Sequence, residues 1–544
     1  MSAAGAPVSG WRAETAGTVA ALRLTARRVR LTVLAWTVPL WGLTAAAPSY
    51  GEVYPSLESR AALIEGMRAS PGTRLLYGVL PLPGTVGQLT QWEIGTYLLV
   101  CAGLMSVLLT CRVLRADEER GLTETLRAAG AGRAVPFLAP MVIVCGAVGL
   151  LAAGVGGILS VLAGSVEELT SCGAWALAGS VAVTGWAFAC LTALACQLAR
   201  SAAGARTLAL VALGTSFALR VAADETTAAW LRWVSPLAWR DLVQPYTHDR
   251  VAPVVLCAVV SLAVGAVAAV AYAGREHLGG YLPDLSASRR RWRVRGHAGL
   301  LTRLTVASAV GWAAAVAAVS ALFGAMSGSI TDLLEPGSPT AAYVDKMAAG
   351  SAVVQFMSLL TVFTVLLVVV AAVQRATSLA ASERDGYTEA EAAAGVSRTG
   401  LFLTQAAAAL GQGAVLLVLA GAVLAGVTST QLTADHAVAR AFVLTVSQLP
   451  GLVAAVGIAL ALVGLAPRRV ALAWAVVSWS AFAQLMGGIV ELPSWAQDLS
   501  VLGHQVDVVG RVSWTPVAVQ AAVGVVGLLV GLAAYRRRDL GGAG

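Results

Sequence analysis

The chain alternates between long apolar runs and short polar segments. Twelve runs come close to or reach the length that a helix needs to cross the ~30 Å hydrocarbon layer of a membrane. They fall at Leu31–Ala47, Ile94–Cys111, Phe137–Ala163, Gly173–Leu198, Thr207–Leu219, Val251–Ala273, Leu304–Met326, Ala348–Val373, Gly400–Val427, Ala441–Ala466, Val470–Val490 and Pro516–Tyr535. The pattern predicts an all-α integral membrane protein with twelve transmembrane helices. The run at Thr207–Leu219 is short, and we expect Val221–Ala223 to complete it while Arg220 snorkels to the interface.

One charged segment occurs twice, at Glu118–Arg133 and at Glu383–Arg398. At an offset of 265 residues, eight of its sixteen positions agree. The matches are Glu118/Glu383, Gly121/Gly386, Thr123/Thr388, Glu124/Glu389, Ala128/Ala393, Ala129/Ala394, Gly130/Gly395 and Arg133/Arg398. Acids at the start, good helix formers in the middle and a closing Gly-x-x-Arg predict a short helix whose end charges suit its dipole. Such a helix at a membrane surface is suited to contact with another protein.

The repeat extends beyond this segment. Trp230, Ser235 and Leu237 match Trp495, Ser500 and Leu502 at the same offset. The last run of each half also ends alike, in AYAGREHLGG (271–280) and AYRRRDLGG (534–542). The sequence therefore predicts two fused six-helix repeats, residues 1–290 and 301–544, joined by a basic cytoplasmic linker at 291–300. An even number of spans in each half gives the two halves parallel orientation.

Composition and charge support a membrane protein and place its loops. The chain is 58% hydrophobic and 12% charged, with a mean hydropathy of +0.76, too apolar for a soluble protein. Its net charge of +8 comes almost wholly from arginine, since Lys346 is the single lysine. With both termini on the cytoplasmic side, 27 of the 37 basic residues lie on that side. The positive charge therefore indicates loops that are retained on the cytoplasmic side, rather than a nucleic-acid partner. On this orientation both charged segments face the cytoplasm.

The N-terminal residues carry a basic, partly apolar pattern. Trp11 is followed by Arg23, Arg27, Arg28 and Arg30 among apolar residues. This pattern is typical of an interfacial amphipathic helix before the first span. A merely basic flank is the alternative.

Two predicted outer segments, 224–250 and 491–515, are rich in tryptophan and proline. Such segments suit short helices that dip into the outer interface. Their candidate external-gate residues are Trp230, Trp233, Ser235, Pro236, Trp239, Trp495 and Ser500. An aromatic belt that only sets the depth of the protein in the bilayer is the alternative.

The sequence lacks the residue patterns that ion coupling, ATP binding, metal binding and catalysis usually need. No Asp, Glu, His or Lys lies inside a predicted span, whereas ion-coupled carriers commonly keep ionisable groups there. Lys346 lies in YVDKMA, without the Gly-rich loop of a Walker A motif. The histidines are scattered, and the cysteines show no metal spacing. We therefore expect no enzyme activity, metal or cofactor in this chain, and an energy source that belongs to a partner.

Three motifs carry a resemblance to a known family. Glu118-Glu119-x-Gly121-x-x-Glu124-x-Leu126 resembles the coupling segment of type-2 ATP-binding-cassette exporter permeases, as do WLRWVSPL (230–237) and RRDL (537–540). The fused double-length form is similar to bacterial exporters of polyketide antibiotics and related drug exporters. The second copy departs from the pattern: Arg384 replaces one acid, Glu391 replaces the leucine, and Val501 stands at the proline position.

The resemblance implies a permease in a bacterial cell membrane that docks a cytoplasmic ATP-binding-cassette ATPase, in two copies that bind ATP-Mg. Its cargo is then a hydrophobic or amphipathic drug, antibiotic or lipid, with no substrate-binding residue identified. The implied coupling residues are Glu118, Glu119, Gly121, Glu124, Gly130 and Arg133 with Glu383, Gly386, Glu389, Gly395 and Arg398. A twelve-span secondary carrier for drugs or lipids and a non-transport membrane protein are the alternatives.

The charge distribution makes the topology testable. Single cysteines at Glu167 and Glu335, in a cysteine-free background, are expected to react with a membrane-impermeant thiol reagent added to intact cells. Cysteines at Arg127, Arg291 and Ala392 are expected to react only after the cells are opened. External labelling at Arg127 in sealed cells would overturn the orientation.

Overall fold

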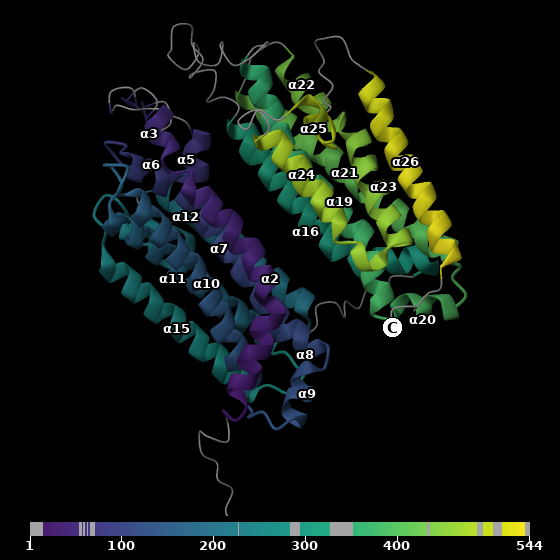
Figure 1. Ribbon diagram of the computed structural model, residues 1–544, viewed down its shortest axis with the longest axis horizontal. Helices are drawn as coiled ribbons and strands as arrows, with labels where there is room; N and C mark the ends of the chain where they lie inside the picture. Colours follow the sequence, from purple (N-terminus) through teal and green to yellow (C-terminus); the bar gives the residue numbers. More distant parts are fainter. Residues whose placement is uncertain are drawn as a thin grey trace, which may run out of the picture. The chain divides into compact units, whose positions relative to one another are not determined.

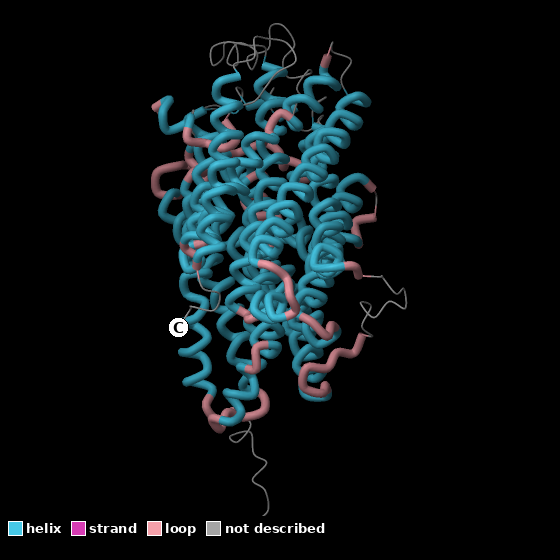
Figure 2. Tube along the Cα trace, turned by 90° about the vertical axis from the view of Figure 1, so that its right-hand side faces the viewer, coloured by secondary structure: helices cyan, strands magenta, loops and turns pink. Residues whose placement is uncertain are grey.

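A computed structural model gives the architecture. It describes residues 15–53, 57, 60–61, 64–65, 71–226, 228–282, 294–326, 352–431, 436–486, 493–503 and 514–538. Within these residues all regular elements are helices, and no strand is found among them (Figure 2). The chain divides into two compact units: unit 1 comprises residues 1–69 and 73–289, and unit 2 comprises residues 70–72 and 290–544.

Unit 1 is a bundle of long helices around one central helix (Figure 1). The long helices are α2 (Thr18–Ala45), α7 (Ile94–Cys111), α10 (Val135–Leu162), α11 (Ser171–Leu198), α12 (Ala202–Glu225) and α15 (Val251–Gly274). Shorter elements are α3 (Ser49–Val53), α5 (Pro71–Tyr77), α6 (Val86–Trp92), the π-helix η1 (Arg112–Ala116), α8 (Asp117–Glu119), α9 (Leu122–Ala128), α13 (Leu231–Val234), the 3₁₀ helix η2 (Pro236–Ala238) and α14 (Trp239–Val243). Helix α11 packs against α7, α10, α12 and α15, so its side chains form much of the core.

Unit 2 is also a helical bundle. Its elements are α16 (Gly296–Met326), α19 (Ala352–Arg384), α20 (Tyr387–Ala393), α21 (Arg398–Gln431), α22 (Ala437–Val446), α23 (Leu449–Leu465), η4 (Pro467–Arg469), α24 (Leu472–Met486), α25 (Ser494–Asp498) and α26 (Trp514–Arg537). Helices α23 and α26 pack very closely: a Cβ atom at Gly457 would lie 2.2 Å from the carbonyl oxygen of Gly524. Glycines allow this approach because they place no side chain between the two backbones. Such close packing is common between membrane helices, which associate without a hydrophobic driving force.

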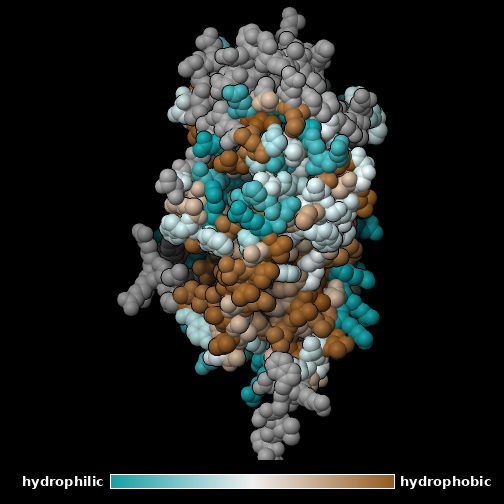
Figure 3. All heavy atoms as spheres, turned by 90° about the vertical axis from the view of Figure 1, so that its left-hand side faces the viewer, coloured by the Kyte–Doolittle hydropathy of each residue, from teal (hydrophilic) through white to brown (hydrophobic). Residues whose placement is uncertain are grey.

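The helices are long and apolar enough to form membrane spans. Within the described ranges, eleven helices meet this condition. Helix α15 leaves Val255, Val259 and Leu262 exposed, and Figure 3 shows hydrophobic side chains gathered over a broad area of this side of the molecule. An apolar surface of this kind is stable only in contact with lipid or another apolar surface. The chain is therefore a multi-pass α-helical membrane protein.

The twelfth predicted span is only partly seen. Helix α24 begins within Val470–Val490 and has 15 residues, ending at Met486, whereas about 20 residues are needed to cross a bilayer. Residues 487–492 lie outside the described part of the chain. The twelve-span layout thus stays a prediction.

The N-terminal helix differs from the expectation of a separate interfacial element. Thr18–Arg30 continues into the first span without a break, as the first turns of α2. Ala21, Thr25, Val29 and Val33 are buried at four-residue spacing, and α2 packs along α10. The apolar stripe that suggested a membrane surface therefore packs against protein. Residues 11–14 of the predicted helix lie outside the described part.

Helix α12 corrects two further expectations. It continues to Glu225, so its candidate span includes Asp224, an acidic residue outside the predicted run. Arg220 is 2% exposed and lies over the ring of Phe217, 4.7 Å from its centroid. It therefore points into unit 1 and does not snorkel outward. The side chains that surround Arg220 come from segments far away in the sequence. A hydropathy profile averages over neighbouring residues and does not detect such contacts.

Candidate functional site

The duplicated segment forms the same turn and short helix in both units. In unit 1 the helical run of α7, η1 and α8 ends at Glu119, Gly121 adopts φ 75°, and the seven-residue α9 follows. In unit 2, α19 ends at Arg384, Gly386 adopts φ 77°, and the seven-residue α20 follows. Both glycines occupy the left-handed region that other residues rarely adopt. A short helix is thus present in each segment, at one end of its bundle (Figure 1). Its predicted start is wrong, because Glu118 and Glu383 belong to the preceding helix and the glycine turn separates them from the short helix.

Glu118 is not on the surface of this segment, where a docking residue was expected. Its side chain is about 6% exposed. Arg275 donates to its two carboxylate oxygens at 2.8 and 2.7 Å, and Arg115 donates at 3.0 Å. The backbone N–H of Leu278 adds a bond of 2.9 Å. A carboxylate already held by four donors is not available to a partner protein, so Glu118 acts inside unit 1.

The corresponding acid in unit 2 has the corresponding partner. Arg538 donates to both carboxylate oxygens of Glu383, whose side chain is 9% exposed. Arg398, another predicted coupling residue, donates to the carbonyl oxygen of Arg538 at 2.7 Å. In both units the acid thus joins the charged segment to the end of the last long helix. Bidentate arginine–carboxylate pairs fix geometry as well as charge.

An aromatic pair lies beside each acid–arginine pair. In unit 1 Tyr272 stacks on Phe137 at 5.3 Å between ring centroids, and the Arg275 guanidinium lies 5.8 Å from the Tyr272 ring. In unit 2 Tyr535 and Phe402 lie 5.6 Å apart, and Arg538 is 5.0 Å from the Tyr535 ring.

These partners were missed by sequence reasoning, although both tyrosines and arginines lie in the AYAGRE and AYRRR endings of the repeat. Recurrence of those endings was the available signal. It did not reveal contact with the acids because the two lie far apart along the chain.

Three consecutive acids in unit 1 hold three different elements. Asp117 accepts two bonds from Arg28 of α2, at 2.7 and 2.8 Å. Glu118 holds the segment after α15. Glu119 accepts the backbone N–H of Ala202, at the start of α12, at 2.8 Å, as an acid suits a helix N-terminus. The residues of α8, just before α9, are therefore joined to α2, to the start of α12 and to the segment after α15.

Unit 2 keeps one of these three ties among its described residues. Ser382 and Arg384 stand at the positions of Asp117 and Glu119, and the Arg384 side chain donates to a carbonyl of its own helix. Only Glu383 therefore makes the corresponding contact. The two charged segments are alike in backbone but differ in how firmly they are joined to the bundle.

The other predicted residues of the segment stay accessible. The Glu124 side chain is 68% exposed, with one carboxylate oxygen 3.2 Å from Nε2 of His277. Glu119, Arg133 and Glu389 are exposed, and Gly130 and Gly395 end the short helices with φ 86° and 92°. The exposed acids of the two segments are thus Glu119 and Glu124 in unit 1 and Asp385 and Glu389 in unit 2.

Five of the predicted external-gate residues lie in unit 1, at the opposite end from α9, and they divide into exposed and buried sets. Trp230 and Trp233 are exposed, whereas Ser235, Pro236 and Trp239 are buried. The Ser235 hydroxyl donates to the carbonyl oxygen of Ser216, on α12, at 2.6 Å. Ser235 thus attaches the outer segment to a long helix.

Unit 2 repeats this arrangement. Trp495 is exposed and Ser500 is buried. Ser500 contacts the Ser480 carbonyl oxygen on α24 at 3.4 Å, and the backbone N–H of Val501 donates to the Ser480 hydroxyl at 3.1 Å. Gating by this segment stays a prediction.

Elsewhere, the described residues contain no group of three His, Cys, Asp or Glu that could hold a metal ion.

The buried Glu118 is expected to stabilise unit 1. Glu118→Gln leaves two arginines without a full counter-charge, and breaking such a buried pair typically costs about 3–5 kcal/mol. The exposed Glu124→Gln is expected to change stability by less than about 0.5 kcal/mol. Thermal unfolding of the purified variants in detergent measures both. Equal melting temperatures for the two variants would contradict the internal role of Glu118.

Comparison with known proteins identifies the family. The family described as Multidrug efflux system permease Rv1217c, C-terminal domain, matches residues 294–536. The chain is also 30% identical to the multidrug efflux system permease protein Rv1217c of Mycobacterium tuberculosis (strain ATCC 25618 / H37Rv), over 96% of this chain and 95% of the relative. That name describes a transport component rather than an enzyme. Since the similarity spans both proteins almost entirely, the chain belongs to the family of multidrug efflux system permeases.

Proposed function

We propose that this chain is the permease subunit of an ATP-binding-cassette exporter, in which α9 and α20 each dock one copy of a separate ATPase subunit. Its cargo is a hydrophobic or amphipathic drug or antibiotic. The observation that carries the proposal is the set of ties made by Asp117, Glu118 and Glu119. A surface helix joined to three long helices is suited to receive motion from a partner and pass it to the spans.

The sequence supports an external energy source. It lacks a Walker A motif, and its single lysine has no glycine-rich loop before it. Binding of ATP-Mg is therefore assigned to the partner. Closure of the ATPase pair would displace α9 and α20, and the acid–arginine pairs would carry that displacement to the last long helix of each unit.

The docking surface proposed here differs from the one expected from sequence. Glu124 and Glu389 are exposed at matching positions of α9 and α20, while Glu118 and Glu383 are held internally. The exposed pair is assigned to contact with the ATPase, and the internal pair to transmission. Glu119 combines both roles, because it is exposed and also holds the start of α12.

A secondary carrier remains the second candidate, favoured by one observation. Asp224 lies within the candidate span of α12 and its side chain is 3% exposed, and ion-coupled carriers use such buried acids. It is paired with Arg232 at 3.4 Å, however, which is a structural role common to buried carboxylates. Export that needs the ATPase and persists when the proton gradient is dissipated would exclude this carrier.

Charge reversal on the exposed acids tests docking. Losing one charge-assisted hydrogen bond, worth about 1.5–3 kcal/mol, weakens docking roughly ten- to a hundredfold. Glu124→Arg and Glu389→Arg are therefore each expected to reduce ATPase co-purification and drug efflux at matched membrane abundance, and the double variant to abolish both. Glu124→Arg should have the larger effect, because unit 1 has more ties to its helices.

The matched control is Glu167→Arg, an exposed acid on a predicted outer segment. It is expected to retain both the ATPase and full efflux. Wild-type ATPase retention in the double variant would show that α9 and α20 are not the docking elements.

A further inference from the structure

A glutamate without a basic partner lies at the start of α7, at the end of unit 1 opposite α9. Glu93 stands between α6 and α7. The candidate span that contains it begins at Val86, whereas the run predicted from sequence begins at Ile94. The Glu93 side chain is half-buried, and among the described residues no arginine, lysine or histidine comes within 4 Å of its carboxylate. An acid in such a place is costly and commonly serves a function.

Three tyrosines from three elements lie near Glu93. Tyr50 of α3 donates its hydroxyl to a carboxylate oxygen of Glu93 at 2.7 Å. Tyr77 of α5 and Tyr97 of α7 meet edge to face, with 5.8 Å between ring centroids and 2.7 Å between hydroxyl oxygens. The charge of Glu93 acts on all three hydroxyl groups. Because a neutral hydroxyl donor leaves the negative charge in place, this aromatic cluster carries an uncompensated carboxylate.

Packing holds the aromatic rings in position. Tyr50 and Tyr77 both pack against a small apolar cluster that includes the buried Trp92. The Tyr77 and Trp92 ring centroids lie 4.8 Å apart, and Nε1 of Trp92 donates to the carbonyl oxygen of Gly78 at 2.9 Å. Rings that are already fixed lose little conformational freedom when a ligand binds.

The face of α7 that carries this cluster is only partly covered. Tyr97 is 38% exposed. Cys101, Leu104 and Leu108 follow at helical spacing on the same side and are half-buried. The face is therefore acidic and aromatic at one end and apolar along its length.

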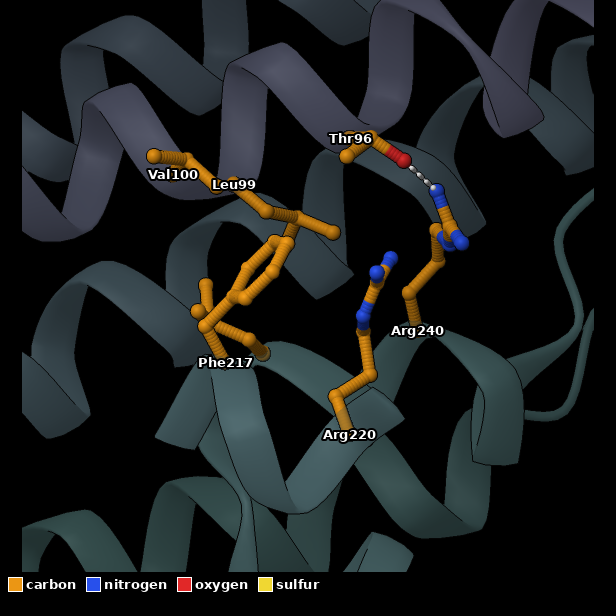
Figure 4. A pocket seen from close by; sticks show the side chains of 7 residues that line it. Thr96, Leu99, Val100, Phe217, Arg220 and Arg240 are labelled. Atoms are coloured by element: carbon orange, nitrogen blue, oxygen red, sulfur yellow. Dashed lines mark hydrogen bonds between the residues drawn. The ribbon is translucent and has the colours of Figure 1, made fainter. Parts of the chain in front are cut away.

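The opposite, buried side of α7 holds an arginine that is already paired. Arg240 donates to the Thr96 hydroxyl at 2.7 Å, beside a small cavity with room for about one water molecule (Figure 4). It also donates to the carbonyl oxygens of Trp92 and Tyr77, and Asp241 supplies a carboxylate at 3.2 Å. Arg240 thus fixes the backbone around the tyrosine cluster while its own charge is balanced by Asp241.

The repeated fold does not need this acid. At the offset of 265 residues, Ser358 and Val362 of α19 stand at the positions of Glu93 and Tyr97. The same long helix is therefore built in unit 2 without a carboxylate or an aromatic ring at these positions.

We propose that this face of α7 binds an amphipathic organic cation, with its positive group at Glu93 and the tyrosine rings and its apolar part along Cys101 and Leu104. A carboxylate and the faces of aromatic rings both attract a cation, whereas the negative face of a ring repels an anion. The inference deepens the proposed function by giving a substrate class, and it rests on that function for the direction of transport.

The binding test uses the purified full-length permease in maltoside detergent, without the ATPase. The probes are tetraphenylphosphonium and tetraphenylborate, which have nearly the same size and apolar surface but opposite charge. Equilibrium dialysis against protein-free micelles cancels partition into the detergent. Wild type is expected to bind the phosphonium at least about tenfold more tightly than the borate, because the carboxylate attracts one and repels the other. Equal affinities, or tighter binding of the borate, would overturn the proposal.

Variants assign the preference to the cluster. Glu93→Gln is expected to weaken phosphonium binding about tenfold, the equivalent of 1.4 kcal/mol, and the matched control Glu167→Gln, an exposed acid on a predicted outer segment, to leave it unchanged. Tyr97→Leu should weaken it about threefold, whereas Tyr97→Phe keeps a ring and stays close to wild type. A phosphonium affinity in Glu93→Gln equal to that of wild type would refute the assignment.

A second measurement needs no variant, because α7 carries a native cysteine one turn after Tyr97. Saturating phosphonium is expected to slow the modification of half-buried Cys101 by N-ethylmaleimide at least about threefold, as followed by mass spectrometry. The exposed Cys172 is the internal control and should react at an unchanged rate. An unchanged rate at Cys101, or a Cys101 that does not react even without ligand, would contradict binding on this face, even where Glu93→Gln failed to fold.

Competition tests which cation occupies the face. Displacement of the phosphonium by decyltrimethylammonium, and not by phosphatidylethanolamine in mixed micelles, supports a free amphipathic cation as cargo. Displacement by phosphatidylethanolamine would assign the face to a lipid amine and contradict the proposal, as would displacement by neither. Because no ATPase is present in these assays, their failure leaves the docking proposal intact, and a failure of docking leaves the binding result intact.

Discussion

The structure depends on one constraint, which is the need to hold a polar surface helix against an apolar bundle. An acid–arginine pair meets this need in each unit: Glu118 with Arg275, which is buried, and Glu383 with Arg538, which is partly buried. Each pair joins the segment that precedes the short helix to the end of the last long helix, beside a stacked or tilted aromatic pair. Buried charges are retained only when their partners are well placed. The pair therefore fixes where α9 and α20 lie on their bundles.

The two units differ in the number of contacts that hold the segment before the short helix. In unit 1 the neighbouring acids add contacts to α2 and α12, so the short α8 that precedes α9 is joined to three elements. In unit 2, Ser382 and Arg384 replace those acids, and α20 depends on Glu383. If α9 and α20 dock two ATPase subunits as proposed, the two contacts are therefore unequal.

Much of the fold follows from hydropathy, because a helix is the spanning structure that satisfies its backbone within a single segment. The short helices also follow, since Gly121 and Gly386 mark turns that few other residues can adopt. Burial of Glu118 could not be predicted, because an acid in a charged segment normally faces water and its partner Arg275 is distant in sequence. The same holds for Arg220, which the apolar run placed at an interface. Helix α2 begins before the apolar run that predicted the first span, because its first turns pack on α10. Hydrophobicity alone does not predict this extension.

The central claim is that the acid–arginine pair transmits motion between the ATPase and the spans. The pair in unit 2 allows the most direct measurement, because Glu383 and Arg538 can be exchanged together. Drug molecules exported per ATP hydrolysed would be measured for Glu383→Arg, Arg538→Glu and the double exchange, in the assembled transporter. Each single change is expected to lower this ratio by about tenfold or more, as for a truncated buried pair, and the exchange to restore much of it. An unchanged ratio in both single variants, or a double variant no better than either, would contradict the claim.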